Sequence, residues 1–275
     1  VVVPGFQGVS NNRITTLGRG GSDLTAVALA GALNADRCDI FTDVDGIYTA
    51  DPRLVSKAQK LGKITYEEML EMASLGSKVL QTRSVELAMN YGVNLQVRSS
   101  FDDKPGTIVV SEEEIVEQQV VSGISQSKEE SKITLLKIAD KPGIAASIFG
   151  PLADASINVD MIVQNISEDG NTTDLTFTVS TTDLKNALEV LETRASNIGV
   201  GQIIADSNVV KISVVGIGMR SHAGIAQKMF MALADKGINI KVISTSEIKV
   251  SVLVAEEYGE LAVRALHSAY GLDSN

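Results

Sequence analysis

Short apolar stretches alternate with longer amphipathic ones along the first 112 residues, and this alternation predicts strands separated by helices. Strands are expected at residues 1–3, 37–42, 94–98 and 106–110, and helices at 24–33, 65–73 and 77–91. Such an order favours an α/β fold with a largely parallel sheet covered on both faces. Ligands of such sheets bind beyond the carboxyl ends of the strands.

The pattern of the first 112 residues ends at an acidic stretch, and we expect residues 113–119 to form a linker. Gly143-Ile144-Ala145 recurs as Gly224-Ile225-Ala226, and Ile157-Asn158 recurs at the same spacing as Ile238-Asn239. This internal repeat predicts two copies of one α/β unit. The first copy has strands at 133–139, 159–166, 174–180 and 201–205 and helices at 143–155 and 184–195. The second has strands at 209–215, 240–245 and 249–255 and helices at 224–236 and 258–270.

The second copy lacks a counterpart of the closing strand of the first. An unpaired sheet edge is prone to aggregation. We therefore expect the extra apolar strand at 120–125 to complete the second sheet, which interleaves the two units. The expected domains are residues 1–112, then 132–206, then 120–125 together with 207–275.

Composition narrows the function classes. The 275 residues carry a formal net charge of −10, which disfavours nucleic-acid partners. One cysteine, Cys38, and two histidines exclude a disulfide framework and a Cys-based zinc site, so no protein-bound metal site is expected. No apolar run approaches the about 18 to 20 residues that span a bilayer, and we expect a cytoplasmic protein without membrane contact. Because the chain starts with Val rather than Met, we also expect a missing N-terminal segment.

The glycine-rich stretch from Thr15 to Asp23 leads directly into the first helix and carries Arg19, Ser22 and Asp23. Glycines allow backbone N–H groups to approach an anion, and the positive end of the following helix points to the same place. The stretch therefore predicts a phosphoryl-transfer site, although it departs from both common phosphate fingerprints. The alternative is a plain strand-to-helix turn in which Ser22 or Asp23 caps the helix.

Five motifs in a fixed order extend this observation. They are Thr16-Leu17-Gly18-Arg19-Gly20-Gly21-Ser22-Asp23, the loop 41–53, Gly76-Ser77-Lys78-Val79-Leu80, Asp140-Lys141-Pro142-Gly143 and Ser244-Thr245-Ser246-Glu247-Ile248. Together they resemble the aspartokinase family, amino-acid kinases with two C-terminal ACT domains. The resemblance implies the C-terminal part of an amino-acid-kinase sheet sandwich followed by two ferredoxin-like (βαββαβ) ACT domains.

The resemblance also implies an activity. Members of the family transfer the γ-phosphoryl group of ATP to the side-chain carboxylate of L-aspartate, the first step of lysine, threonine and methionine biosynthesis. That carboxylate is already ionised, so the reaction needs positioning and positive charge, with Mg²⁺ on the phosphates, rather than a general base. By resemblance, Arg19 and Ser22 hold the aspartate and Asp23 orients the reacting groups. The implied nucleotide-binding residues are Thr42, Asp43, Tyr48, Arg53 and Lys78.

Lysine, threonine or both are the implied feedback inhibitors, bound where ACT modules pair, and such pairing implies a homo-oligomer. The implied effector residues are Asp140, Gly143, Ala145, Asn158, Asp160, Gln164, Thr245, Ser246 and Glu247. Other interpretations remain: a solvated Lys78, a packed Tyr48, and His267 on a polar helix face without a role. The chain also lacks the family's Lys-Phe-Gly-Gly element, so we do not expect it to turn over efficiently by itself. Alternative functions are a non-catalytic amino-acid-sensing regulatory subunit and another amino-acid kinase.

Overall fold

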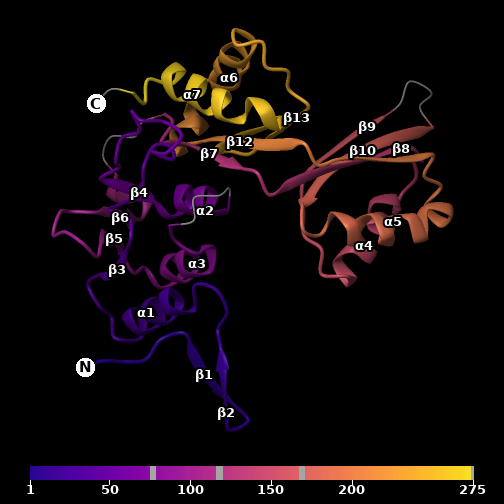
Figure 1. The fold of residues 1–275 in the computed structure, drawn as a ribbon. Coiled ribbons are helices and arrows are strands. Elements are labelled where there is room, and N and C mark those ends of the chain that lie inside the picture. Colours follow the sequence, from indigo (N-terminus) through magenta and orange to yellow (C-terminus); the bar gives the residue numbers. More distant parts are fainter. Residues whose placement is uncertain (75–78, 116–119, 167–170, 274–275) are drawn as a thin grey trace.

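Four-stranded sheets and the helices packed on them succeed one another along the chain in the computed structural model (Figure 1). The structure describes residues 1–74, 79–115, 120–166 and 171–273. The N-terminal part contains β3 (Cys38–Thr42), β4 (Lys63–Thr65), β5 (Leu95–Ser99) and β6 (Thr107–Val110), with α1 (Gly21–Ala32), α2 (Tyr66–Ser74) and α3 (Thr82–Tyr91).

The sheet of the N-terminal part has the order β3-β5-β6-β4. Parallel pairing joins β3 to β5 and β4 to β6, but β5 and β6 are antiparallel. The expectation of a largely parallel sheet is therefore only partly met, and the sheet is mixed. The reason is the short link between β5 and β6, since a parallel crossover needs a dozen or more residues.

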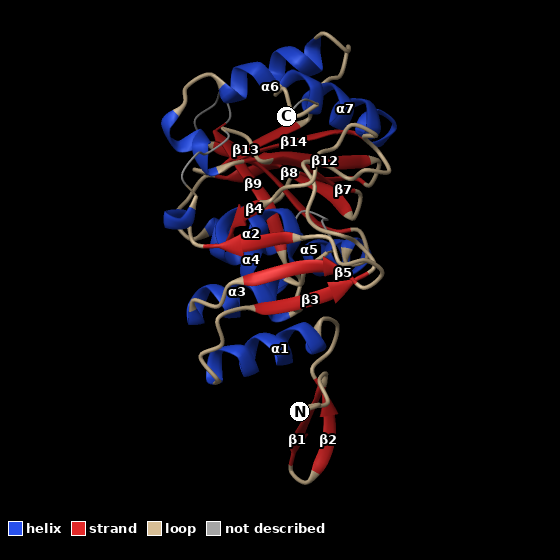
Figure 2. Ribbon diagram, turned by 90° about the vertical axis from the view of Figure 1, so that its left-hand side faces the viewer, coloured by secondary structure: helices blue, strands red, loops and turns tan. Residues whose placement is uncertain are grey.

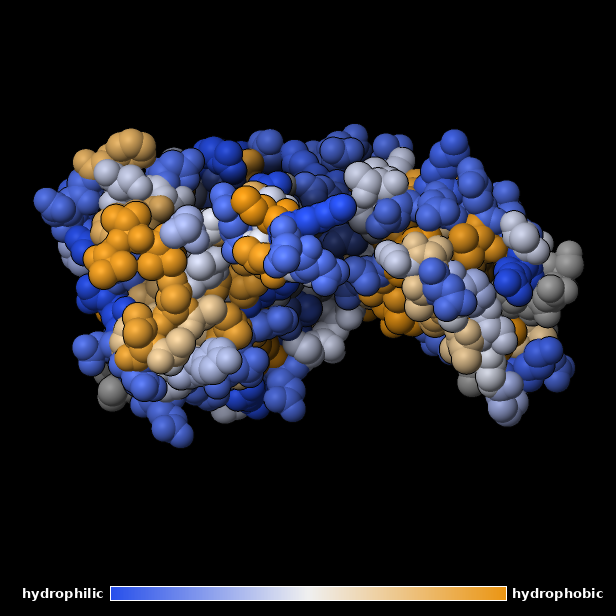
Figure 3. Space-filling model, turned by 90° about the horizontal axis from the view of Figure 1, so that it is seen from below, coloured by the Kyte–Doolittle hydropathy of each residue, from blue (hydrophilic) through white to orange (hydrophobic). Residues whose placement is uncertain are grey.

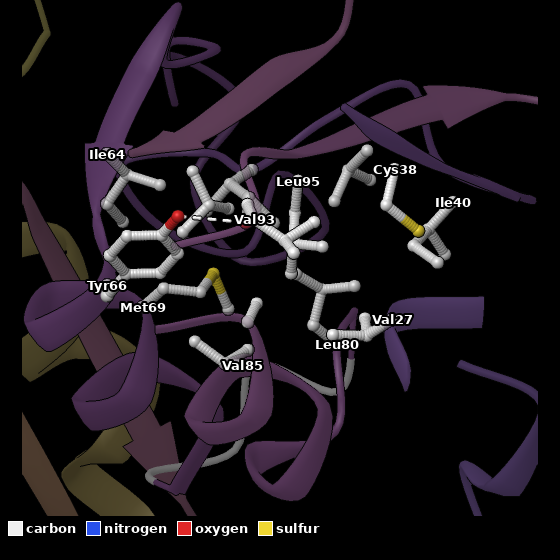
Figure 4. Packing of buried hydrophobic residues seen from close by; sticks show 14 of the residues in the cluster. Val27, Cys38, Ile40, Ile64, Tyr66, Met69, Leu80, Val85, Val93 and Leu95 are labelled. Carbon is white, nitrogen blue, oxygen red and sulfur yellow. Dashed lines mark hydrogen bonds between the residues drawn. The ribbon is translucent and has the colours of Figure 1, made fainter. Parts of the chain in front are cut away.

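Apolar residues of this sheet and its helices form one core, in which Val27, Met69, Val85 and Leu95 are fully buried (Figure 4). The one polar group that Tyr66 brings into this core is satisfied, because its hydroxyl donates to the Val93 carbonyl at 2.8 Å. Burial raises the pKa of Tyr66 to about 12, with the charges of Glu114 and Glu67 as smaller contributions.

The expected strand at residues 1–3 is wrong. These residues are exposed and lie outside any strand. The first strands are instead β1 (Gln7–Ser10) and β2 (Arg13–Thr16), an antiparallel hairpin. Its turn residues Asn11 and Asn12 both have positive φ, 51° and 58°. Asn tolerates that conformation, which two-residue hairpin turns require.

The first repeat comprises β8 (Glu130–Ala139), α4 (Ile144–Asp154), β9 (Val159–Ile166), β10 (Thr172–Ser180), α5 (Leu184–Ile198) and β11 (Gln202–Asp206). Its sheet has the order β11-β8-β10-β9, with antiparallel neighbours throughout. The predicted order of strands and helices is confirmed for this repeat.

The second repeat comprises β12 (Val209–Val215), η2 (Ile217–Ser221), α6 (Ile225–Ala234), β13 (Val242–Thr245), β14 (Lys249–Ala255), η3 (Glu256–Tyr258) and α7 (Gly259–Ala269). Its sheet, β13-β14-β12-β7, includes β7 (Gly123–Ser127), which precedes the first repeat in the chain. Residues from the expected strand 120–125 thus pair with β12. Of the expected linker, η1 (Glu112–Glu114) and Ile115 are described, whereas 116–119 lie outside the described residues.

The three units meet at defined places. Strands β9 and β13 lie side by side between the two repeats, and α4 and α5 lie on the opposite side from α6 and α7 (Figure 1). From below, a recess separates the N-terminal part from the first repeat (Figure 3). The second repeat contacts the N-terminal part directly, since Ala50, Leu54, Val55 and Ala58 join its core. Among the described helices, none is long and apolar enough to cross a membrane.

Candidate functional site

The glycine-rich turn joins β2 to α1. Gly18 and Gly20 have positive φ of 76° and 72°, and Gly20 is the N-cap residue of α1. Ser22 and Asp23 therefore lie inside the first helical turn, and the alternative that one of them caps the helix is wrong. The first N–H groups of a helix have no intrahelical acceptor, so the turn offers donors and a positive dipole end to an anion.

Arg83 at the start of α3 holds this turn in place. Its Nη2 donates to the carbonyl of Leu17 at 2.8 Å and to that of Arg19 at 3.2 Å. A Cβ at Gly20 would lie only 2.0 Å from the side chain of Gln81, so glycine is required there. Sequence reasoning missed Arg83, because nothing in the local pattern links two segments more than sixty residues apart.

The three candidate catalytic residues differ in exposure. Arg19 and Ser22 are exposed, whereas Asp23 is partly buried. The Ser22 hydroxyl donates to Oδ1 of Asp23 at 3.4 Å. Burial raises the pKa of Asp23, and the hydrogen bond from Ser22 opposes that shift. Cys38 is buried and its thiol pKa is also raised, by burial first and then by Asp39 and Asp23, which argues against a nucleophilic role.

The end of β3 supplies a second group of candidates. The Thr42 hydroxyl donates to Oδ1 of Asp43 at 3.1 Å, and Asp43 is exposed. Figure 2 shows the N-terminal end of α1 on the same side of the sheet as the carboxyl ends of β3 and β5. The turn with Arg19 and the end of β3 with Thr42 therefore share one edge of the sheet, where α/β sheets bind ligands.

The loop after β3 contains a polar cluster that the sequence showed only in part. The Tyr48 hydroxyl donates to Oδ1 of Asp45 at 2.9 Å. Lys60 Nζ contacts Oδ2 of Asp45 at 3.3 Å and donates to the carbonyl of Pro105 at 3.0 Å. Burial would raise the pKa of Asp45, but the hydrogen bonds from Tyr48 and Lys60 and the ammonium charge lower it overall. Asp45 and Lys60 are thus additional candidates for the group of polar residues after β3. Asp45 lies within the motif at residues 41–53, whereas Lys60 lies beyond it.

The two cationic candidates are placed differently. Arg53 is 89% exposed and its guanidinium binds Asp51, with Nη2 to Oδ2 at 2.7 Å and Nε to Oδ1 at 3.0 Å. These bonds, chiefly the side-chain ones, lower the pKa of Asp51. Lys78 lies outside the described residues.

The candidate effector residues lie on both repeats. Gly143 has φ 87° and caps α4, and Asp140, Ala145, Asn158 and Gln164 are exposed on the first repeat. Residues 245–247 are exposed at the end of β13, which lies beside β9. Of the residues on the first repeat, Gln164 is on β9 and Asn158 directly precedes that strand, whereas Asp140, Gly143 and Ala145 lie around the start of α4. Glu247 also contacts Arg220, with Oε2 to Nε at 3.4 Å.

Asp160 has a partner that sequence reasoning did not anticipate. Its Oδ2 accepts a hydrogen bond at 2.9 Å from Lys211 of β12, which is only 4% exposed and also pairs with Glu130. Burial would raise the pKa of Asp160, but the bond and charge of Lys211 lower it overall. This ion cluster joins the two repeats.

The comparisons with known proteins agree with this organisation. Residues 1–99 match the amino acid kinase family, and residues 132–195 and 212–270 each match the ACT domain. The aspartokinase of Pseudomonas aeruginosa is 60% identical over the whole chain, which covers 67% of that protein.

Solved structures are similar as well. The aspartate kinase of Clostridium acetobutylicum has a TM-score of 0.87 at 27% identity, over 97% of this chain and 62% of that one. E. coli aspartokinase III with aspartate and ADP (R-state) has a TM-score of 0.81 at 31% identity, over 96% of this chain and 59% of that one. The same protein with lysine and aspartate (T-state) has a TM-score of 0.75 at 32% identity, over 96% of this chain and 58% of that one.

The chain therefore spans about two thirds of the length of the Pseudomonas protein and less of these solved structures. On the strength of its matches to the kinase and ACT models and its identity to named aspartokinases, it belongs to the aspartate kinase family.

Proposed function

We propose that the full-length protein carrying this sequence transfers the γ-phosphoryl group of ATP to the side-chain carboxylate of L-aspartate, giving 4-phospho-L-aspartate and ADP. The observation that carries this proposal is the turn from Gly18 to Asp23. It lies at the N-terminal end of α1, on the sheet edge where β3 ends, in a chain 60% identical to an aspartokinase.

Each residue of that edge has a role in the proposal. Arg19 holds a carboxylate of aspartate through its planar guanidinium, and Ser22 donates a hydrogen bond to it. Asp23 orients the groups around the transferring phosphoryl. ATP enters as its Mg²⁺ complex, and the metal neutralises charge on the phosphates. Backbone N–H groups of the turn stabilise the negative charge of the two reacting anions.

The nucleotide is assigned to Thr42, Asp43, Tyr48 and Arg53, together with Lys78. Lys60, which is only partly exposed, adds a positive charge beside Tyr48. We call residues 43–60 the nucleotide loop. Asp43 directly follows β3 and is exposed, and Arg53 is exposed in the loop, so both side chains are accessible to a ligand, which supports this assignment.

Lysine, threonine or both are proposed to bind the ACT repeats and to lower the activity. The support is the left-handed turn at Gly143 ahead of α4, whose first N–H groups suit an α-carboxylate, and the position of β13 beside β9. The kinase edge and the ACT pocket are distinct, so inhibition is an allosteric coupling, typically worth about 1–3 kcal/mol. Pairing of ACT domains between copies would make the protein a homo-oligomer.

Replacement of Arg19 tests the proposal. In the full-length protein, Arg19→Ala should abolish aspartate-dependent ADP release while lysine and threonine still bind, as measured by calorimetry. Arg194→Ala, which removes an exposed arginine of α5, is the matched control and should leave turnover unchanged. Unchanged turnover in Arg19→Ala would exclude its assigned role. Effector binding by a wild-type protein that shows no turnover would favour a purely regulatory subunit.

A further inference from the structure

A buried chain of hydrogen bonds links the nucleotide loop to the second ACT repeat. Nε2 of His267 on α7 lies 2.8 Å from Oγ1 of Thr49, and its Nδ1 lies 2.6 Å from Oδ1 of Asp273. His267 is fully buried and Thr49 is 3% exposed. The prediction that His267 lies on a polar face of its helix is therefore wrong, because the side chain is buried and hydrogen-bonded on both ring nitrogens.

The neighbours of this chain define the direction of its hydrogen bonds. Asp273 has a lowered pKa, first because Ser268 donates to it and then because His267 does, so it acts as an acceptor. Nδ1 of His267 is accordingly the donor. Oγ1 of Thr49 already accepts from the backbone N–H of Gln59 at 2.9 Å, which leaves the Thr49 hydroxyl proton for Nε2.

Thr49 is attached to the ACT repeat a second time through its backbone. Its carbonyl accepts from the N–H of Ile124 on β7 at 2.7 Å, and the next residue, Ala50, packs in the core of the second repeat. On the other side, Thr49 directly follows Tyr48, which pairs with Lys60 in a β-bridge and binds Asp45. Thr49 therefore lies between the ACT core and the polar part of the nucleotide loop.

We propose that His267 is a positioning residue for the nucleotide: through Thr49 it sets the place of the loop that carries Tyr48. This rests on the proposed function of that loop. The kinase part does not hold the loop by itself, because Ala50, Leu54, Val55 and Ala58 pack into the core of the second repeat. A displacement of α7 would move Thr49, and Tyr48 with it, without touching the aspartate turn at Gly18–Asp23. The second repeat thereby controls affinity for ATP and leaves affinity for aspartate unchanged.

Two amide substitutions at His267 separate its two contacts. In His267→Gln the amide oxygen can take the place of Nε2 and accept the hydrogen bond from the Thr49 hydroxyl. In His267→Asn the amide nitrogen can take the place of Nδ1 and keep only the hydrogen bond to Asp273. In the full-length protein we expect His267→Asn to raise KM for ATP about 5- to 10-fold, the lower part of the usual coupling range, with KM for aspartate unchanged. His267→Gln should stay within twofold of wild type.

Two substitutions test the same hydrogen bond from the side of Thr49. Thr49→Val removes the hydroxyl, and Thr49→Ser keeps it. Thr49→Val should raise KM for ATP as His267→Asn does, the double variant should be no worse than either single one, and Thr49→Ser should resemble wild type. These variants also decide the question if His267→Asn does not fold.

Equal KM values for ATP in Thr49→Val and Thr49→Ser would overturn the inference. So would parallel increases in KM for ATP and KM for aspartate in Thr49→Val or His267→Asn, because a merely structural contact predicts that both rise together. These results would leave the proposed function standing provided that wild type phosphorylates aspartate and Arg19→Ala does not. A wild-type protein without ATP-dependent phosphorylation of aspartate would overturn both.

Discussion

Oε1 of Glu68 lies 2.9 Å from the backbone nitrogen of Ile217, so a buried carboxylate of α2 accepts a hydrogen bond from the second ACT repeat. The same oxygen accepts from the Ser122 hydroxyl at 2.6 Å, and Oε2 accepts from the N–H and hydroxyl of Thr65, both at 3.2 Å. Glu68 thus completes a capping box with Thr65 and also joins the kinase part to the second ACT repeat.

Glu68→Gln should destabilise this junction, because an amide NH₂ would face groups that themselves donate. We expect a loss of about 1–3 kcal/mol in the free energy of unfolding. Urea denaturation measures it, with Glu86→Gln on the exposed side of α3 as the control. Equal midpoints for the two variants would show that Glu68 does not join the parts.

Arg83→Ala should impair catalysis more than stability. The variant removes the hydrogen bonds to the carbonyls of Leu17 and Arg19, so the turn loses the clamp that shapes it. A hydrogen bond from a charged donor is worth about 1.5–3 kcal/mol, which predicts a fall in kcat/KM for aspartate of 10-fold or more. Steady-state kinetics measure the fall. A kcat/KM within twofold of wild type would refute the clamping role.

Asp23→Asn should abolish phosphoryl transfer without lowering stability. The folded-state pKa of Asp23 is raised above 3.8, chiefly by burial, so ionised Asp23 opposes folding at neutral pH. The amide removes that charge at similar size. We expect an equal or higher melting temperature beside a loss of turnover, measured by calorimetry and by ADP release. A clearly lower melting temperature would mean that the carboxylate stabilises the fold.

Ala145→Thr should relieve feedback inhibition. Ala145 is exposed in the first turn of α4, next to the Gly143 turn, so a larger side chain there would crowd the proposed effector pocket. The equivalent residue of the second repeat is Ala226, and Ala226→Thr is the control. Lysine and threonine titrations of activity should show a higher inhibitory concentration only for Ala145→Thr. Undiminished sensitivity to both amino acids would remove Ala145 from the pocket.

The bond between Asp160 and Lys211 should make the contact between the ACT repeats sensitive to acid. The folded-state pKa of Asp160 lies below its ordinary 3.8, so its contribution to stability is present above pH 3.8 and is lost as the pH falls through the lower folded value. Asp160→Asn lacks this contribution. Urea midpoints at pH 6 and pH 3 should therefore fall less in Asp160→Asn than in wild type. Equal falls would contradict the ion pair.

Much of the fold can be read from local sequence. The strands β12 and β14 have the predicted bounds, because alternating and β-branched apolar residues define a strand without outside help. The internal repeat predicted two copies of one α/β unit, and the extra strand before them predicted a pairing that is seen between β7 and β12. The position of the glycine turn ahead of α1 is equally local, since only glycine tolerates the crowded, left-handed turn at Gly20.

Other features were predicted wrongly or could not be predicted from local sequence. Residues 1–3 resemble a strand, yet a strand needs a neighbour to pair with, and the hairpin at 7–16 depends on a turn signal that was overlooked. His267 looked polar and unimportant because a helical pattern cannot show that a loop 218 positions earlier supplies its partner.

The sequence by itself determined most of the strands and helices, the doubled α/β unit and the position of the glycine turn, because periodicity and turn preferences act over about ten neighbouring residues. Only the tertiary structure decided that Arg83 clamps the turn, that Glu68 reaches Ile217 and that His267 holds Thr49. These contacts join residues far apart in the chain, and their partners are chosen by the packing of whole domains rather than by local preference.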